Sequence, residues 1–324
     1  MKSPSRNAAT ASKKTKVSKL SRSAPANTAA SMTAEDYIDA ARSAVTKRAY
    51  AADLAHFLAN GGKLPATPQQ LSAYLAKLAA TLAVATIERR LIGIHRAHQD
   101  LNMTSPAVHV SVRQTMQGIR RTLGTAQRRV RPILKDDLLE MLALVDQQQP
   151  VRAARDRALL LIGFAGAFRR AELVAIQYED ITVVEEGIEI FLRRSKTDQE
   201  GEGRTVFIPR AKGARCPIAA IDQWTLLSGL ESGYVFRRVT RYDTVGEASL
   251  TGQSVALILK AAYRRIGGNA DLVAGHSLRA GYVTTAALDG MLPYQIQHQT
   301  GHRSIVTLAR YIRPLELRKI PSLL

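Results

Sequence analysis

Apolar residues recur at helical spacing along residues 32–124, and alternating strand-like runs do not interrupt them. Two stretches carry clear helix-start signals. Thr33 with Asp36 resembles a capping box, and Thr67-Pro68-Gln69-Gln70 joins an N-cap to an N1 proline and an N3 glutamine. The pattern predicts helices near residues 33–41, 46–59, 67–82, 87–94 and 105–124. This part of the chain is therefore expected to be a small, all-helical module.

From Pro132 onward the pattern is mixed, with helical periods and short alternating runs in turn. The segments Ile188–Leu192 and Thr205–Ile208 read as strands, and a long polar loop at 193–204 joins them. Helices are predicted over 134–145, over 153–164, from Pro217 onward and over 254–265. The expected fold class is mainly α with a small β-sheet.

Two stretches lack apolar periodicity and divide the chain. Residues 1–31 are rich in Ser, Ala, Thr and Lys and contain no acidic residue, which predicts a disordered basic tail. A transit peptide has a similar composition and stays open as an alternative. Residues 127–131 are basic and unpatterned, which predicts a linker. The expected parts are thus the tail (1–31), a helical domain (32–126) and a larger second domain (127–324).

The charge of the chain changes this picture most. The 324 residues carry a formal charge of +19, with a pI near 10.4. Such an excess of Lys and Arg attracts polyanions, of which nucleic acid is the usual one; a basic surface that serves solubility alone is the alternative. No apolar run reaches the roughly 18 residues of a membrane span, and no basic stretch has a matching apolar face, so no membrane partner is expected. The single Cys216 excludes an internal disulfide.

Candidate chemistry gathers in the stretch from Gly275 to Tyr311. His276 and Arg279 are three residues apart, so a helix would present both side chains on one face. His302 and Tyr311 flank a helix-like segment. A phenol among cationic donors predicts a nucleophile directed at an anion. The other tyrosines, such as Tyr263 and Tyr294, fall in helical patterns and are expected to pack.

A metal centre is the alternative to this interpretation. His298 and His302 are four residues apart, a spacing that places two zinc ligands on one helix face. Gly301 interrupts that helix, however, and no cysteine or carboxylate lies in register. The sequence also has no phosphate-binding P-loop and no clustered acids that could hold magnesium. We therefore expect chemistry without a metal or cofactor.

Together these motifs resemble the tyrosine recombinases, also called the phage integrase family. The motifs that carry the resemblance are Ala165-Gly-Ala-Phe-Arg169-Arg-Ala-Glu-Leu173, Arg194-Ser-Lys196-Thr, His276-Ser-Leu-Arg279, Gly301-His302 and Tyr311. Each motif is weak alone, but their shared order and spacing are specific. The helical module resembles the family's core-binding domain, so the likeness covers roughly 290 residues. Thr300 departs from the pattern, because leucine is commoner before the Gly-His pair.

The resemblance implies a role for each matching residue. It assigns the nonbridging phosphate oxygens to Arg169 and Arg279, and planar, permanently charged guanidiniums suit that task. It assigns general-acid catalysis to Lys196 and the nucleophile to Tyr311. Glu172 would support the arginines, although its spacing from Arg169 also fits a purely structural ion pair. His276 would assist proton transfer at Tyr311 or at the phosphate, and His302 would donate a hydrogen bond to a nonbridging oxygen.

The implied activity is site-specific DNA recombination. A 3′-phosphotyrosyl intermediate would conserve the energy of the broken bond, and strands would be exchanged through a Holliday junction. The implied partner is double-stranded DNA with inverted-repeat sites, bound by a dimer per site and a synaptic homotetramer. The expected location is the cytoplasm of a prokaryote, on the nucleoid. Two rivals stay open: a type IB topoisomerase-like enzyme, which shares the fold, and a non-catalytic architectural DNA-binding protein.

Basic residues outside these motifs are candidate contacts to DNA. They lie on two predicted helices of the module and on the linker, and most would touch phosphates rather than bases. The candidates are Lys47, Arg48, Arg89, Arg90, Arg128, Arg129 and Arg131.

Overall fold

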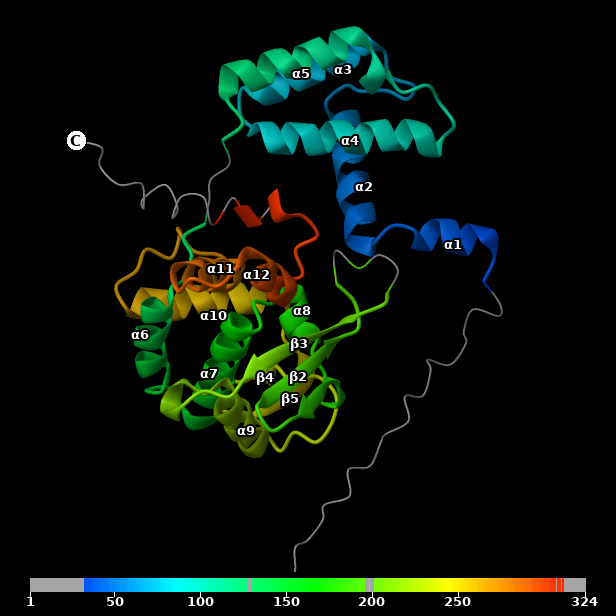
Figure 1. Ribbon diagram of the computed structural model, residues 1–324. Coiled ribbons are helices and arrows are strands. Elements are labelled where there is room, and N and C mark those ends of the chain that lie inside the picture. The colour runs from blue at the N-terminus through cyan, green and yellow to red at the C-terminus, as the bar shows by residue number, and fades with distance from the viewer. Residues whose placement is uncertain are drawn as a thin grey trace, which may run out of the picture. The chain divides into compact units, whose positions relative to one another are not determined.

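The computed structural model of the protein describes residues 32–126, 130–195, 198, 201–306, 308, 309 and 311. The chain divides into two compact units, the first ending at Gln127 and the second beginning at Arg128 (Figure 1). No helix in the described residues is both long and apolar enough to cross a membrane. The two units are described in turn.

The first unit is built from helices, without a strand among its described residues. Its helices are α1 (Ala34–Ala40), α2 (Ala44–Ala59), α3 (Pro68–Ala79), α4 (Val84–Asp100) and α5 (Val110–Leu123), with a 3-10 turn at Pro106–Val108. Helix α2 packs against α4, and α3 against α5. Their core is apolar and closed to solvent, with Leu71, Leu75, Ile87 and Ile94 fully buried.

The predicted start signals operate as expected in this unit. The Thr33 and Thr67 side chains each accept the backbone N–H of the third helical residue, and each forms a reciprocal capping box. One prediction was wrong in detail. Ser105-Pro106 opens only the 3-10 turn, and His109 then caps a separate helix, α5, whose C-terminal cap is Gly124 with φ 73°. A side-chain acceptor at His109 restarts the helix, which an apolar period alone does not reveal.

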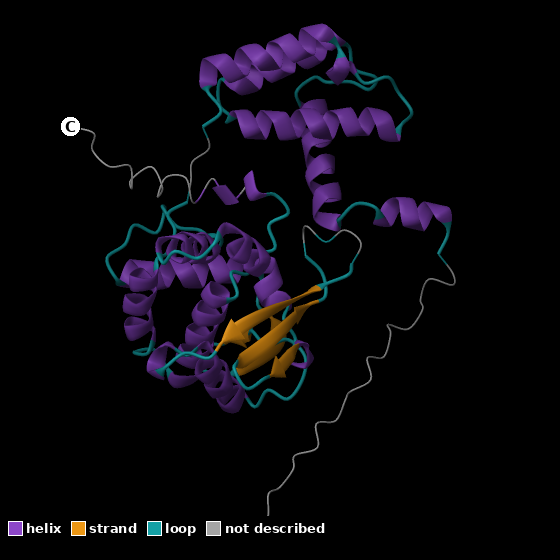
Figure 2. Cartoon of the chain, in the orientation of Figure 1, coloured by secondary structure: helices purple, strands orange, loops and turns teal. Residues whose placement is uncertain are grey.

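The second unit mixes helices with two small sheets (Figure 2). Its helices are α6 (Lys135–Val145), α7 (Pro150–Ala165), α8 (Arg170–Ala175), α9 (Pro217–Ser228), α10 (Gly252–Arg265), α11 (Ser277–Leu288) and α12 (Pro293–Thr300), with 3-10 turns at Tyr178–Asp180 and Gly213–Arg215. Its strands are β1 (Ile181–Val183), β2 (Gly187–Leu192), β3 (Arg204–Pro209), β4 (Arg237–Val239) and β5 (Val245–Ser249). The expected class, mainly α with a small β-sheet, is confirmed.

The strands form an antiparallel sheet in the order β1-β2-β3 and a separate antiparallel β4-β5 pair. Strands β2 and β3 were predicted, because apolar residues such as Ile188, Ile190 and Val206 alternate with exposed ones and are buried. Strands β1, β4 and β5 were missed. They are three to five residues long and only partly buried, too short to establish an alternating pattern.

Helix α7 lies at the centre of the second unit and is buried along most of its length. It packs against α9, whose Trp224 is fully buried and donates its indole N–H to the Val235 carbonyl. Helix α11 also packs on α7 and on the segment that leads into α6. At that crossing Gly281 lies so close to the Ile133 carbonyl that a Cβ on it would stand 1.7 Å from the oxygen. These contacts fix the start of α11, which carries part of the site.

Candidate active site

The turn between α7 and α8 positions Arg169, which is the N-cap residue of α8. Glu172 holds it from both sides: one carboxylate oxygen accepts the Arg169 backbone N–H at 2.9 Å, and the other lies 2.5 Å from Nη1. Glu172 is buried, whereas part of the Arg169 side chain stays exposed. Both expectations for Glu172, support of the arginine and a structural ion pair, therefore describe the same contact.

Arg279 projects from the first turn of α11 and is 1% exposed. Its Nη1 donates to the carbonyl of Ala167 at 2.8 Å. Ala167 has φ 49°, a left-handed conformation that is rare for residues other than glycine and is often found at functional sites. Within the described residues Arg279 pairs with no carboxylate, and its Nε has no hydrogen-bond partner. The Arg279 charge is thus buried without a counter-charge of its own.

His276 and Tyr311 meet at the edge of the site. His276 caps the start of α11, and its Nε2 lies 3.1 Å from the Tyr311 hydroxyl. Tyr311 packs on a small apolar cluster formed by α11, α12 and Leu308. Although His276 has an exposed edge, burial of its ring and the charge of Arg279 lower the pKa of the imidazole below its ordinary value. A neutral His276 is therefore able to accept the Tyr311 hydroxyl proton.

His302 lies between Arg279 and the end of α12. Gly301, with φ 65°, ends that helix in a left-handed conformation, and His302 follows it directly. The His302 Nε2 is 3.4 Å from Nη2 of Arg279, and the Nδ1 is 2.7 Å from the Thr300 hydroxyl. Burial, followed by the charges of Arg279 and Arg169, lowers the pKa of His302 to about 4. The histidine is neutral at pH 7 in the free protein.

Sequence reasoning missed the residues that fix the end of α12. Arg204, at the start of β3, donates to the carbonyls of Gln299 and Thr300. The Gln299 amide donates in turn to the carbonyls of Ala165 and Phe207. A Cβ on Gly301 would stand 2.8 Å from the Arg204 Nε, so the glycine also makes room for this arginine. No period or motif marks Arg204 in the sequence.

Lys196 lies outside the described residues, so its predicted place in the site stays a prediction. The loop that contains it is bracketed by described residues. The carboxylate of Asp198 accepts the backbone N–H groups of Gly201, Glu202 and Gly203. The bonds to these amides lower the pKa of Asp198. These bonds tie the described residues 201–203 to Asp198 ahead of β3.

The tyrosines and histidines that were not assigned to the site differ from expectation in one case. Tyr263 is buried, as predicted, whereas Tyr294 is 64% exposed and does not pack. His298 is exposed on α12, and nowhere in the described residues do three His, Cys, Asp or Glu side chains come close enough together to hold a metal ion. The expectation of metal-free chemistry stays a prediction.

The candidate DNA contacts of the helical unit are partly engaged within that unit. Arg89 and Arg90 both approach the buried Asp53 carboxylate, and Arg90 also donates to the Tyr74 hydroxyl. With 15% of its side chain exposed, Arg90 has a structural role that leaves little of it for a phosphate. Arg48 is exposed, and Lys47 pairs with Asp39.

The linker candidates fall at the start of the second unit. Arg131 lies within reach of Asp137 and stacks on the Tyr263 ring. Arg128 and Arg129 lie outside the described residues. The remaining DNA contacts therefore stay predictions.

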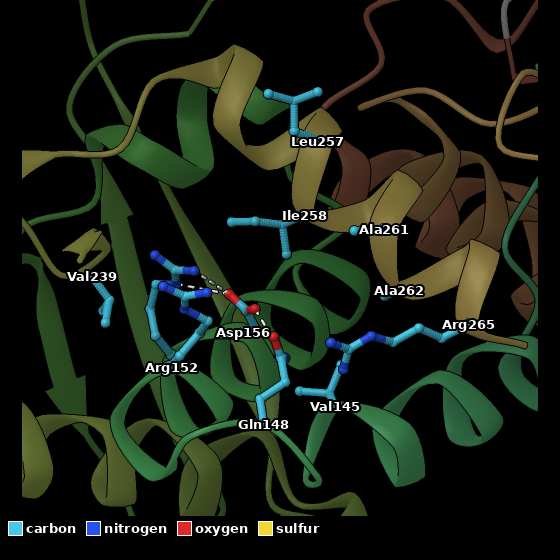
Figure 3. A pocket seen from close by; sticks show the side chains of 11 residues that line it. Val145, Gln148, Arg152, Asp156, Val239, Leu257, Ile258, Ala261, Ala262 and Arg265 are labelled. Carbon is cyan, nitrogen blue, oxygen red and sulfur yellow. Dashed lines mark hydrogen bonds and ion pairs between the residues drawn. The ribbon is translucent and has the colours of Figure 1, made fainter. Parts of the chain in front are cut away.

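A cavity of about 270 Å³ opens elsewhere in the second unit, between α6, α7, α10 and β4 (Figure 3). Its floor holds a buried ion pair, in which Arg155 donates to the Asp156 carboxylate at 2.8 Å and Gln148 donates to the other oxygen. None of the candidate active-site residues lines it. Because the Asp156 charge is already paired, we regard the cavity as a structural feature of the fold.

Comparisons with known proteins give a consistent picture. The model of a family described as the phage integrase family matches residues 132–318. A protein of Selenomonas ruminantium named integrase/recombinase xerD homolog is 37% identical over 291 residues, which covers 87% of this chain and 85% of that protein.

Solved structures agree at the level of the fold. The XerH site-specific recombinase in a post-cleavage complex with a palindromic difH substrate matches with a TM-score of 0.59 and 17% identity, covering 78% of this chain and 70% of that one. A lambda integrase dimer bound to a COC′ core site also has a TM-score of 0.59, at 15% identity, over 90% of this chain and 77% of that one.

Proposed function

The chain belongs to the phage integrase family, the tyrosine recombinases that break and rejoin DNA, and we propose that Tyr311 is its nucleophile in a site-specific recombination reaction. The anion that Tyr311 attacks would be a phosphodiester, and the intermediate would be a 3′-phosphotyrosyl bond. The groups around it would be Arg169, His276, Arg279 and His302.

One observation carries this assignment: the guanidinium of Arg279 is buried without a carboxylate partner. Removing an ion from water costs several kcal/mol unless an opposite charge meets it. Within the described residues no carboxylate pairs directly with Arg279: the nearby Glu172 is bonded to Arg169, and Arg169 and Arg204 add to the local positive charge. Burial, followed by the charge of Arg169, lowers the pKa of Arg279 to about 10, so it still carries its charge at neutral pH. A phosphodiester would supply the missing negative charge.

The proposed reaction follows from the contact between His276 and Tyr311. His276 Nε2 accepts the phenolic proton while the Tyr311 oxygen attacks phosphorus. The bond from phosphorus to the 5′-oxygen breaks, and the leaving oxygen takes up a proton, for which we propose Lys196 as the donor. Arg169 and Arg279 would stabilise the charge that develops on the nonbridging oxygens. Because one phosphoester replaces another, resealing requires no ATP.

For the assembly we propose double-stranded DNA with inverted-repeat sites, one dimer per site and a synaptic homotetramer that passes through a Holliday junction. The palindromic substrate named for XerH and the dimer named for lambda integrase support this arrangement by analogy. We further propose that the protein acts on the nucleoid in the cytoplasm of a prokaryote, as a bacterial relative suggests.

The experiment that tests the function compares exchange with relaxation. Plasmids with two cognate sites, one site or none are incubated with the wild-type protein and with Tyr311→Phe. We expect recombinant product only from two sites, and none from Tyr311→Phe, which still binds DNA. Relaxation of the site-free plasmid without any exchange would instead indicate a type IB topoisomerase. Equal behaviour of the two proteins would indicate an architectural DNA-binding protein.

A further inference from the structure

The Thr300 hydroxyl occupies an unusual position at the end of α12. Thr300 is fully buried, and its Oγ1 lies 2.7 Å from the Ile296 carbonyl oxygen and 3.3 Å from that of Gln297. The same Oγ1 lies 2.7 Å from Nδ1 of His302. One hydroxyl therefore contacts two carbonyl oxygens and one ring nitrogen.

A hydroxyl has only one proton to donate, and a carbonyl oxygen can only accept. The short contact with Ile296 requires the Thr300 proton to point at that carbonyl. The Thr300 oxygen then faces His302 with a lone pair, so the contact at 2.7 Å is a hydrogen bond only if Nδ1 carries a proton. The opposite tautomer would set two lone pairs against each other.

The other side of the ring leads to the same tautomer. Nη2 of Arg279 lies 3.4 Å from Nε2 of His302, and a guanidinium nitrogen can only donate. A neutral histidine with its proton on Nδ1 accepts from Arg279 through Nε2 and donates to Thr300 through Nδ1. The donors then run in one direction, from Arg279 through His302 and Thr300 to the Ile296 carbonyl.

We propose that Thr300 is a positioning residue that holds His302 in its Nδ1-protonated tautomer, so that Nε2 faces the phosphate site as a proton acceptor. The assignment of a phosphate site rests on the proposed function, whereas the tautomer rests on the contacts alone. The chain has threonine here in place of the leucine that is commoner in its family, and a leucine could not accept the Nδ1 proton.

The proposal revises the role expected of His302. With its proton on Nδ1, the neutral ring cannot donate to a nonbridging oxygen until Nε2 also takes up a proton. Burial of the ring and the charges of Arg279, Arg169 and Arg204 disfavour that step in the free protein. An arriving phosphodiester adds a negative charge and favours it. Thr300 accepts from Nδ1 in both states, so the proton is gained on the side that faces the DNA.

The tautomer can be measured without DNA on the full-length protein. Histidine labelled with ¹⁵N distinguishes protonated from unprotonated Nδ1 and Nε2 by chemical shift, and the spectrum of His302→Gln assigns the signals. We expect Nδ1–H in the wild type at pH 7 and in Thr300→Ser, which keeps the hydroxyl. Thr300→Val has a similar shape but lacks the hydroxyl. In this variant we expect His302 to change from the Nδ1–H tautomer to the Nε2–H tautomer or to a mixture of the two.

A matched control is available in α9, where Thr225 makes the same bond to the carbonyl four residues earlier, at 2.8 Å, with no histidine involved. Thr225→Val should leave the His302 signals unchanged. A wild-type His302 protonated on Nε2, or a Thr300→Val protein whose His302 signals match those of the wild type, would overturn the proposal.

A second measurement links the tautomer to cleavage. The rate of single-turnover cleavage is expected to fall about 2- to 10-fold in Thr300→Val, the effect of one lost hydrogen bond. Thr300→Ser should recover it, and DNA affinity should not change. An unchanged rate in Thr300→Val would contradict the positioning role. If the wild type does not cleave DNA at all, the proposed function fails, while the NMR result still decides the tautomer.

Discussion

At the scale of single residues, the site is defined by an imbalance of charge. Arg169, Arg204 and Arg279 converge around one carboxylate, Glu172, and the two histidines lie within the field of these cations. Burial and cationic neighbours both disfavour an added positive charge, so the pKa values of His276 and His302 are lowered. The result is a site that holds permanent charge for an anion and neutral imidazoles for proton transfer.

Because His276 is neutral at pH 7, we expect the rate of DNA cleavage to depend on pH. A lowered pKa means that the ring is neutral at pH 7 and takes up a proton only below its ordinary value of 6.5. Once protonated, Nε2 no longer accepts the Tyr311 proton. The second-order rate constant for cleavage, which reports on the free protein, should therefore fall on the acid side with a midpoint below pH 6.5.

The matching control is His276→Gln, which cannot titrate. This variant should cleave DNA more slowly at pH 7. Its plot of cleavage rate against pH should lack the fall on the acid side (the acid limb) that protonation of His276 causes. A wild-type limb centred above pH 6.5, or an unaltered limb in His276→Gln, would contradict the assignment of His276 as proton acceptor.

Single residues also show what sequence could predict. The spacing of His276 and Arg279 indicated a shared helix face, and the two lie at the start of α11. Arg204 and the left-handed Ala167 gave no signal. Arg204 acts through backbone carbonyls that any sequence provides, and a left-handed conformation is one that alanine by itself rarely adopts. Neither leaves a mark in a pattern of residue types.

At the scale of elements, helices with explicit caps were predicted best. The capping residues Thr33 and Thr67 mark the starts of α1 and α3, because a side-chain acceptor at the N-cap is a local property of the sequence. Short strands such as β1 and β4 depend instead on partners distant in the chain. Local pattern therefore accounts for the helices more fully than for the sheets.

Two helical glycines offer a paired test of how the elements pack. An alanine at Gly281 would force the α11 backbone away from the Ile133 carbonyl, and we expect Gly281→Ala to destabilise the fold by about 1–3 kcal/mol. Gly118 is exposed in α5 and has open space where a Cβ would lie. Gly118→Ala should stabilise by about 0.5–1 kcal/mol through helix propensity.

Urea unfolding at equilibrium, followed by circular dichroism, measures both changes in the free energy of unfolding. Equal effects of Gly118→Ala and Gly281→Ala would show that close approach between α11 and Ile133 is not what requires glycine at position 281.

At the scale of the whole molecule, the charge of +19 is the feature that pointed to DNA before any motif did. Contacts to phosphates release counterions, so the logarithm of the binding constant falls with the logarithm of salt concentration by about 0.9 for each phosphate contacted on duplex DNA. Arg48 is an exposed candidate of the helical unit without a carboxylate partner among the described residues. Arg48→Ala should weaken binding equally on cognate and unrelated DNA and reduce the salt slope by about 1.

The control for this variant is Arg241→Ala, which removes an exposed arginine that stacks on Tyr242 and is not a candidate contact. It should leave the slope unchanged. A loss of affinity in Arg48→Ala that is confined to the cognate site would mean that the residue reads bases rather than phosphates.

The candidate site joins α7–α8, the start of β3, the first turn of α11 and the chain after α12. We propose that these segments present a phosphate to Tyr311. Mass spectrometry of the covalent complex trapped on a nicked duplex tests this claim directly. After nuclease and trypsin digestion, the wild type and the exposed-tyrosine control Tyr294→Phe should both carry a nucleotide on Tyr311, and Tyr311→Phe should yield no adduct. A nucleotide attached to any other residue, or an adduct formed by Tyr311→Phe, would contradict it.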